Sequence, residues 1–158
     1  MLSLSRVIVV LNAAMMLGIS APALAVLGQP AQTVGSDAQA VGSRVHTLAQ
    51  GPAQTPYTVQ QFTTPARIEV REYVSPDGTV FAVAWNGPHP PDLAALLGSY
   101  FTDYKSMAGQ TQGSYGLHHQ SLQGDRLVIQ SGGHMGDMWG RAWDPQLLPS
   151  GVGEEEIK

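Results

Sequence analysis

The sequence contains no cysteine. This absence excludes disulfides, a thiolate nucleophile, cysteine-ligated zinc, iron–sulfur clusters and covalently attached haem. It also excludes the lipid-attached cysteine of a bacterial lipoprotein. A folded domain must therefore be stabilised by its hydrophobic core alone. This is feasible for about 130 residues, the length that remains of the 158-residue chain after the leader described below.

Charged residues are also scarce. They make up 13% of the chain, against 43% hydrophobic residues, and the formal net charge is −4. This composition predicts one folded domain and not an acidic disordered chain. A small negative charge gives no electrostatic reason to bind nucleic acid or an anionic membrane surface, so we expect no nucleic-acid partner.

The first 25 residues have the three parts of a secretory signal peptide. Arg6 supplies a positive charge, residues 7–19 are apolar with one polar exception, and Ala23 to Ala25 form an A-x-A cleavage signal. The apolar stretch is shorter than the roughly 20 residues of a membrane span, and Pro22 would end its helix. We therefore expect cleavage after Ala25 and no stable membrane span afterwards; an uncleaved anchor or a buried helix is the alternative.

The expected destination follows from the same leader. There is no twin-arginine pair, which favours the general secretory route. The mature protein is thus expected to be periplasmic or secreted, and not a lipoprotein.

Residues 26–56 predict a flexible lead-in. They are rich in Gly, Ala, Gln, Ser and Pro and contain few large apolar residues. Val45 and Leu48, near the end, could dock locally. Order is expected to begin near Tyr57, so a single α+β domain is predicted at residues 57–158.

Residues 67–85 predict a β-hairpin. Residues 67–74 place Ile68, Val70 and Val74 on one face, and residues 79–85 are apolar on both faces. The turn between them, residues 75–78, reads Ser-Pro-Asp-Gly, in which the glycine can take a positive φ. Further strands are expected at residues 57–62, at 117–122 with 126–131 as a second hairpin, and at 138–143, with Gly132-Gly133 breaking the pattern.

An amphipathic helix is predicted from Pro91 to about Met107. Asp92 falls in its first turn, where a negative charge suits the helix dipole. Because the apolar stripe must be buried, the predicted fold class is α+β, with an antiparallel sheet of about five to six strands and this helix packed on one face. The stripe recurs at spacings of three and four residues: Leu93, Leu96, Leu97, Tyr100, Phe101 and Tyr104.

Six short sequence segments of the predicted domain form a specific pattern when they are taken together. They are Val70–Val74, Val80–Pro88, Pro91–Leu93 with Leu96–Phe101, Ser131–Met135, Gly140–Ala142 and Leu147–Gly151. In this order they resemble the bacterial family called domain of unknown function 2844. The resemblance covers roughly residues 57–157 and the signal peptide. It implies an exported protein of a Gram-negative bacterium and assigns no activity and no functional residue.

The five histidines raise the question of a metal site, because neutral imidazole binds zinc, copper and nickel. The best trio would combine His118, His134 and Asp137. His118 and His119 are adjacent on a predicted strand and so point to opposite faces. Since no HExxH or similar close spacing is present, surface or turn histidines are the preferred interpretation, and we predict no metal and no other cofactor.

The sequence gives no hydrolase signature. Ser131 and His134 are close neighbours, but the G-x-S-x-G elbow is missing. Gly132 and Gly133 between them are better explained as a bend or bulge with positive φ.

Two glutamates of the first hairpin differ in their expected surroundings. Glu69 and Glu72 lie three apart on a strand and so on opposite faces, which excludes a facing acid–base pair. Glu72 falls on the apolar face. This position predicts a buried carboxylate paired with an arginine, or else an edge strand; the candidate partners are Arg71, Arg126 and Arg141.

Aromatic residues supply the remaining candidate surface. Trp85 is expected in the core because its strand is apolar on both faces. Trp139 and Trp143 lie in a Gly-rich region and are expected to be partly exposed. The predicted binding surface combines His134, Trp139, Arg141 and Trp143 with Glu72.

Together these features predict a non-enzymatic periplasmic or secreted module that binds another envelope protein or a small envelope ligand. One alternative is a small periplasmic metal-binding protein or enzyme that uses His118 or His134. Another is an assembly accessory whose sheet edge pairs with a partner strand. The sequence leaves the oligomeric state open.

Overall fold

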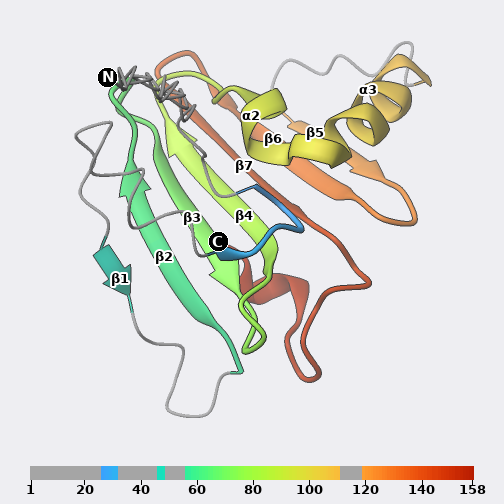
Figure 1. The fold of residues 1–158 in the computed structure, drawn as a ribbon. Helices are drawn as coiled ribbons and strands as arrows, with labels where there is room; N and C mark the ends of the chain where they lie inside the picture. The colour runs from blue at the N-terminus through green and yellow to red at the C-terminus, as the bar shows by residue number, and fades with distance from the viewer. Residues whose placement is uncertain (1–25, 32–45, 49–55, 111–118) are drawn as a thin grey trace, which may run out of the picture.

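The computed structural model describes residues 26–31, 46–48, 56–110 and 119–158. They form a seven-stranded sheet of order β1-β2-β3-β4-β7-β6-β5, in which each neighbouring pair is antiparallel (Figure 1). The predicted α+β class is confirmed, with one strand more than expected because β1 forms inside the predicted lead-in. The strands are β1 (His46–Leu48), β2 (Thr58–Thr63), β3 (Glu69–Val74), β4 (Val80–Gly87), β5 (His119–Gln123), β6 (Val128–His134) and β7 (Asp137–Trp143).

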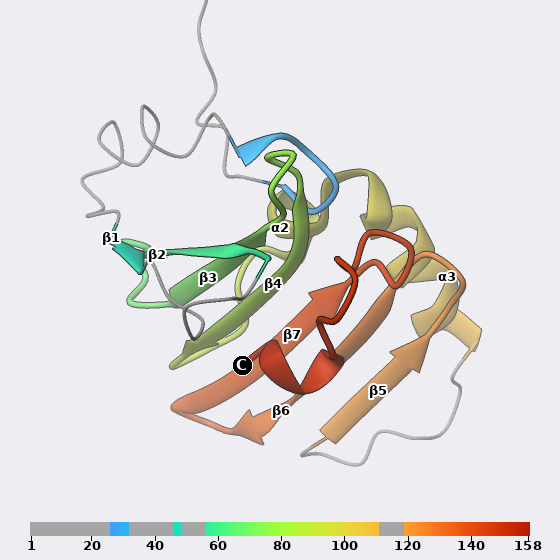
Figure 2. The same cartoon turned by 90° about the horizontal axis from the view of Figure 1, so that it is seen from below.

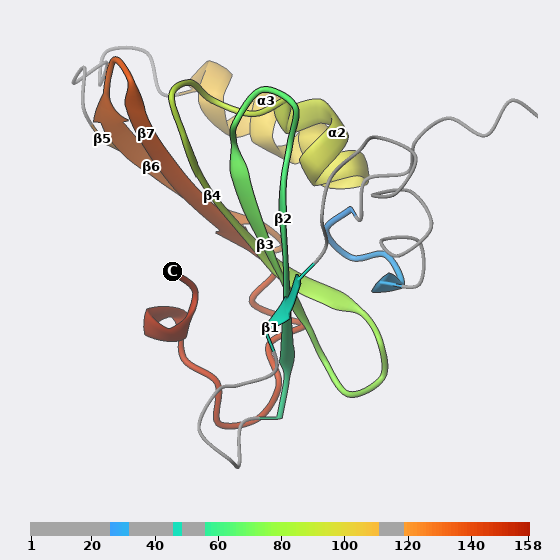
Figure 3. The same cartoon turned by 90° about the vertical axis from the view of Figure 1, so that its left-hand side faces the viewer.

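The helical part follows β4 and lies on one face of the sheet (Figure 3). It consists of α2 (Leu93–Leu97), the 3-10 turn η2 (Gly98–Tyr100) and α3 (Phe101–Gln110). The predicted stripe faces the core, with Leu96, Leu97 and Tyr100 buried and the other three residues partly buried.

Two details of the helix differ from the prediction. Asp92 is the N-cap and not a first-turn residue, since its Oδ1 accepts hydrogen bonds from the N–H groups of Ala94 and Ala95 at 2.9 and 3.1 Å. The helix is also interrupted at Gly98, which has a φ of 52°. A side chain at this glycine would meet Val26, whose Cγ1 lies 2.1 Å from an ideal Cβ position.

The hairpins follow the local turn signals. The β3–β4 turn uses Gly78 at a φ of 87°, as its sequence predicts. In contrast, Gly132 and Gly133 do not end a strand, because β6 runs through both of them to His134. Only Gly133 has a positive φ, and a Cβ there would lie 2.2 Å from the main-chain oxygen of Asp137.

Residues 26–31 belong to the folded domain, although order was expected to begin near Tyr57. Leu27 is fully buried, and its N–H donates to the Leu96 oxygen at 3.3 Å. Pro30 forms a bridge with Thr79 at the β3–β4 turn. A single leucine among small residues thus anchors this segment between the helix and the hairpin.

The sheet has a hydrophobic cluster on each face. The first lies beneath the helices. The second lies on the opposite face and is covered by residues 144–158, including η3 (Glu154–Glu156) (Figures 2 and 3). Within the described ranges, no helix has both the length and the apolar character needed to cross a membrane.

Candidate functional site

The face of the sheet that is turned away from the helices carries three cross-strand rows of side chains. We call this face the groove face. Alternate residues of a strand share a face, so positions two apart fall in successive rows. The covered row is Tyr73, Ala82, Trp143 and Val128; the arginine row is Gln61, Arg71, Ala84, Arg141 and Gln130; and the open row is Glu69, Asn86, Trp139, Gly132 and His119.

The covered row is a small core. Ile157 is fully buried against it, and Leu147, Leu148 and Val152 pack alongside. Trp143 is only 2% exposed. The expectation that Trp143 contributes to an exposed binding surface is therefore wrong, because the chain after β7 folds back over its ring.

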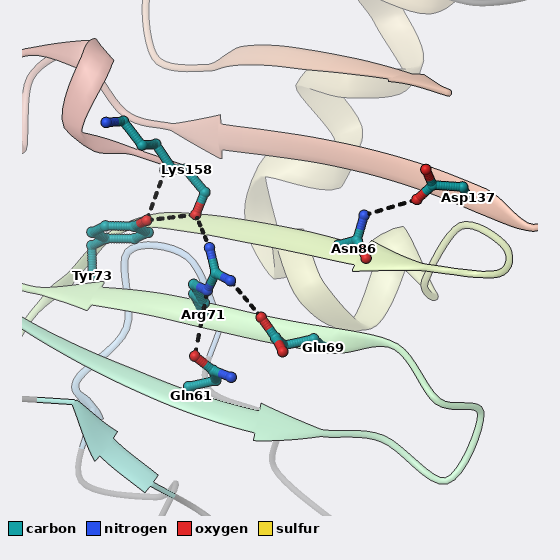
Figure 4. A network of polar contacts seen from close by, with 7 residues as sticks. All are labelled: Gln61, Glu69, Arg71, Tyr73, Asn86, Asp137 and Lys158. Atoms are coloured by element: carbon teal, nitrogen blue, oxygen red, sulfur yellow. Dashed lines mark hydrogen bonds and ion pairs between the residues drawn. The ribbon is translucent and has the colours of Figure 1, made fainter. Parts of the chain in front are cut away.

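The arginine row holds two guanidinium groups in fixed positions. Arg71 donates through Nε to Gln61 Oε1 at 3.4 Å and through Nη1 to the Lys158 main-chain oxygen at 2.9 Å (Figure 4). The main-chain N–H of Lys158 also donates to the Tyr73 hydroxyl at 2.7 Å. These bonds tie the C-terminal segment to β3.

Arg141 repeats the arrangement on β7. Its Nε and Nη2 donate to Gln130 Oε1 at 2.9 and 2.7 Å. Its Nη1 donates to the main-chain oxygens of Glu154 and Ile157, each at 2.8 Å. Each arginine is therefore supported by a glutamine on the next strand outward and by the C-terminal segment.

A groove of about 390 Å³ lies between the two arginines. Its central strand is β4, where Ala84 separates Arg71 from Arg141 in the row. Because alanine has a short side chain, the row is lower in the middle than at the two guanidinium groups, although Ala84 itself is only 3% exposed. The lining residues are Glu69, Arg71, Ala84, Trp85, Asn86, Trp139, Gly140, Arg141, Ile157 and Lys158.

The open row forms the accessible rim of the groove. Glu69 Oε1 is 2.5 Å from Arg71 Nη2, and Asn86 Nδ2 donates to Asp137 Oδ1 at 3.2 Å (Figure 4). Trp139 is 37% exposed, and its ring centroid lies 5.6 Å from that of His119. The expected partial exposure of Trp139 is confirmed, as is the burial of Trp85 at 5%.

The charge of the groove is opposite in sign to that of the chain. The lining includes three cationic residues and one carboxylate, whereas the whole chain has a formal charge of −4. The main chain of Lys158 contacts Arg71, whereas its ammonium is exposed and points away from Arg71, Glu69 and Asn86 (Figure 4). Among the described residues the only ion pair is that between Arg71 and Glu69. Arg141 and Lys158 therefore have no carboxylate partner in the part of the chain that the structure describes.

The structure separates the histidine candidates from the groove. His134 ends β6, and its Nδ1 lies 3.2 Å from the Met135 main-chain oxygen. Ser131 and His134 are three apart on this strand and so point to opposite faces. His118 lies outside the described residues, and within them no cluster of three His, Cys, Asp or Glu side chains could hold a metal ion.

Glu72 lies on the helix side of the sheet, away from the groove. It is fully buried, and neither carboxylate oxygen has a hydrogen-bond partner among the described residues. The prediction of an arginine partner or an edge strand is wrong, because β3 lies between β2 and β4 and the arginine row occupies the other face. Burial raises the pKa of Glu72 to about 8.

Sequence reasoning identified Trp139 and Arg141 but missed their neighbours. Strand alternation alone places Glu69 and Arg71 on one face. It does not place them opposite β7, because that requires the strand order with β4 between β3 and β7. The register then adds Ala84 and Asn86, and the returning chain adds Lys158.

The fold and site define a small α+β scaffold with a helix-covered core and a preformed groove, lined by apolar and charged residues, on the opposite face. The chain belongs to the family described as Protein of unknown function (DUF2844), whose model matches residues 23–157. No curated protein and no solved structure matches the chain.

Proposed function

We propose that the protein is exported and acts in the cell envelope as a non-enzymatic binding module, with the groove as its ligand site. The groove itself carries this proposal. Its two arginines are held by hydrogen bonds to Gln61, Gln130 and the C-terminal segment before any ligand binds. A preformed site of this kind loses little conformational entropy on binding, and its volume lies within the range of small-ligand sites.

Export is supported by the leader and by the position of the folded domain. The family match begins at residue 23, next to the expected cleavage position after Ala25. Leu27, the second residue after that position, is buried in the domain. Among the described residues, the packed core thus begins directly after the expected cleavage position.

A binding role is favoured over catalysis by how the polar groups of the groove are used. Arg71 and Arg141 support the C-terminal segment, and Glu69 is paired with Arg71. Nucleophilic catalysis would need a nucleophile and a general base within hydrogen-bond distance of each other. The groove lining contains no Ser, Thr, His or Tyr to serve in that pair.

Export is tested by producing the full chain in a Gram-negative host, fractionating the cells and determining the N-terminus. The expected mature N-terminus is Val26. Ala25→Phe should block cleavage because the A-x-A signal needs small residues, whereas Leu24→Phe, at the middle position, should be processed normally. A periplasmic or secreted protein that keeps Met1–Ala25, or a wild-type chain found only in the cytoplasm, would contradict export.

Binding is tested by NMR with the dialysable fraction of digested cell envelope as the probe. The indole N–H signal of Trp139, assigned with Trp139→Phe, should shift in the wild type. It should remain unshifted in Ala84→Leu, whose larger side chain fills the groove. Met135→Ala, a change at a 97% exposed residue outside the lining, is the matched control and should respond like the wild type.

Two results would contradict the proposed site. One is a Trp139 signal that never shifts with any envelope fraction. The other is an equal shift in Ala84→Leu, provided that its remaining spectrum shows a folded protein. Trp139→Leu, followed by signals of β4 and β7, gives an independent measurement if Ala84→Leu fails to fold.

A further inference from the structure

The groove places an exposed indole ring beside hydrogen-bonding groups and an excess of positive charge. We infer that its ligand is a saccharide unit that carries an acidic group. This inference rests on the proposed function and specifies the ligand of the same site. Three features of the lining carry it: the ring of Trp139, the polar pair Glu69 and Asn86, and the cations Arg71, Arg141 and Lys158.

The open row combines an apolar surface with hydrogen-bonding groups, as a sugar ring combines C–H faces with hydroxyl groups. Trp139 offers an apolar surface that can pack on the C–H face of a pyranose. In the same row, Asn86 and Glu69 offer an amide and a carboxylate, which exchange hydrogen bonds with hydroxyl groups. An apolar ligand would remove water from these groups without using their remaining donors and acceptors, and that loss would weaken its binding.

The arginine row adds the preference for an acid. A guanidinium has five N–H groups. In the described contacts, Arg71 uses three of its N–H groups and Arg141 uses four. Three of the ten N–H groups of the two arginines therefore remain for a ligand. Hydrogen bonds between a guanidinium and an acid are charge-assisted and stronger than those to a neutral hydroxyl.

The charges also orient the ligand. Glu69 neutralises Arg71 at the β3 side, whereas Arg141 and Lys158 have no carboxylate partner among the described residues. The acidic group is therefore expected beside Arg141, with hydroxyl groups toward Glu69 and Asn86. Trp139 is two residues from Arg141 on the same face of β7, so one ring can cover the indole while its acid reaches the guanidinium.

The inference is tested by titrating the mature protein with methyl β-D-glucuronide and with methyl β-D-glucoside, which differ only in a carboxylate. Glucose 1-phosphate examines a phosphate as the acid, and inorganic phosphate examines an acid without a sugar. We expect at least one acidic sugar to bind about tenfold more tightly than the neutral glucoside, a difference typical of a charge-assisted hydrogen bond. Inorganic phosphate should bind more weakly than either acidic sugar.

Matched variants separate the two parts of the site. Lys158→Gln removes a positive charge at the edge of the groove and keeps the main-chain atoms that bind Arg71 and Tyr73. It should weaken the acidic sugar about threefold to fivefold and leave the glucoside unchanged. Lys105→Gln, which removes a charge on α3 outside the groove, should change neither. Trp139→Leu should weaken both sugars by about tenfold.

Equal binding of the glucuronide, the glucose phosphate and the glucoside would overturn the acidic preference, and so would equal losses in Lys158→Gln and Lys105→Gln. Inorganic phosphate that binds as tightly as the sugars, or binding that survives Trp139→Leu unchanged, would overturn the saccharide. If no sugar binds, the inference fails. The envelope-fraction experiment then shows separately whether the groove is a ligand site for another compound.

Discussion

The two faces of the sheet are covered in different ways. The helix face is closed by large apolar side chains from α2, η2 and residues 26–31. The groove face is closed only over its covered row, by residues 144–158, which are attached to Arg71 and Arg141 through main-chain oxygens. The difference shows that one face supplies most of the core, while the other leaves two rows of polar side chains within reach of a ligand.

The faces also differ in the hydrogen bonding of Arg71, Arg141 and Glu72. On the groove face both guanidinium groups have several hydrogen-bond partners. On the helix face Glu72 has none among the described residues, and burial raises its pKa. A carboxyl in such surroundings remains protonated in the folded state to a much higher pH than in the unfolded chain. Glu72 therefore makes the stability of the helix face depend on pH.

The largest expected effect is the pH dependence caused by Glu72. Its pKa is about 8 in the folded state, against an ordinary value of 4.5. Because the folded state binds the proton more tightly, the stabilisation is complete below pH 4.5 and declines as the pH rises to about 8. The loss is on the order of 5 kcal/mol in the free energy of unfolding. Urea unfolding at several pH values should show it in the wild type and not in Glu72→Gln.

The matched control for this experiment is Glu69→Gln, which alters a partly exposed carboxylate on the other face. Other carboxylates give the wild type pH dependence of their own, so the difference between wild type and each variant is the informative quantity. If Glu72→Gln and the wild type differed by a constant amount from pH 4.5 to 9, the protonated carboxyl would be refuted.

Shortening one buried side chain on each face of the sheet allows the contributions of the two covers to stability to be compared. Leu97 is fully buried under α2, and Leu97→Ala should lower the free energy of unfolding by about 2–5 kcal/mol. Ile157 is equally buried, but it lies in the C-terminal segment, which we expect to detach without unfolding the sheet. Ile157→Ala should therefore cost about 1–2 kcal/mol, with faster amide exchange confined to residues 144–158. Equal losses with global exchange in both variants would mean that the two covers unfold together.

The hydroxyl groups of two tyrosines should differ in the same way in their contribution to stability, with smaller effects. The Tyr100 hydroxyl donates to buried Asp144 Oδ2 at 2.7 Å, and the Tyr57 hydroxyl donates to Glu156 Oε2 at the same distance in a part-buried contact. Tyr100→Phe leaves a buried carboxylate short of a partner and should cost about 1–2 kcal/mol, whereas Tyr57→Phe should cost about 0.5 kcal/mol. Thermal unfolding of both variants measures the difference, and a reversed order would contradict it.

Local sequence signals were sufficient for the elements of the helix face. The turn at residues 75–78 and the stripe from Leu93 to Tyr104 each act over a few neighbouring residues, so pattern and propensity predict them directly. The same signals did not identify β1 or buried Leu27. Both occur among small and polar residues without a period, and they become ordered only through contacts with β2, the helix and the β3–β4 turn.

The groove could not be predicted because it depends on long-range register. Arg71 and Arg141 come from strands far apart in the sequence and meet across Ala84 only because β4 lies between them. Trp139 and Trp143 have similar local surroundings in the sequence. They differ because residues 144–158 cover the row of Trp143 and stop before the row of Trp139.

The smallest expected effect follows from this boundary. Trp139→Phe should change the free energy of unfolding by no more than about 0.5 kcal/mol, because the ring is partly exposed and outside both clusters. Trp143→Phe, two residues along the same face, should cost clearly more because it leaves a gap beneath Ile157. A large loss in Trp139→Phe, measured by urea unfolding, would show that the open row stabilises the fold. A negligible loss would mean that folding places little constraint on the side chain at 139, as expected where an indole is kept for a ligand.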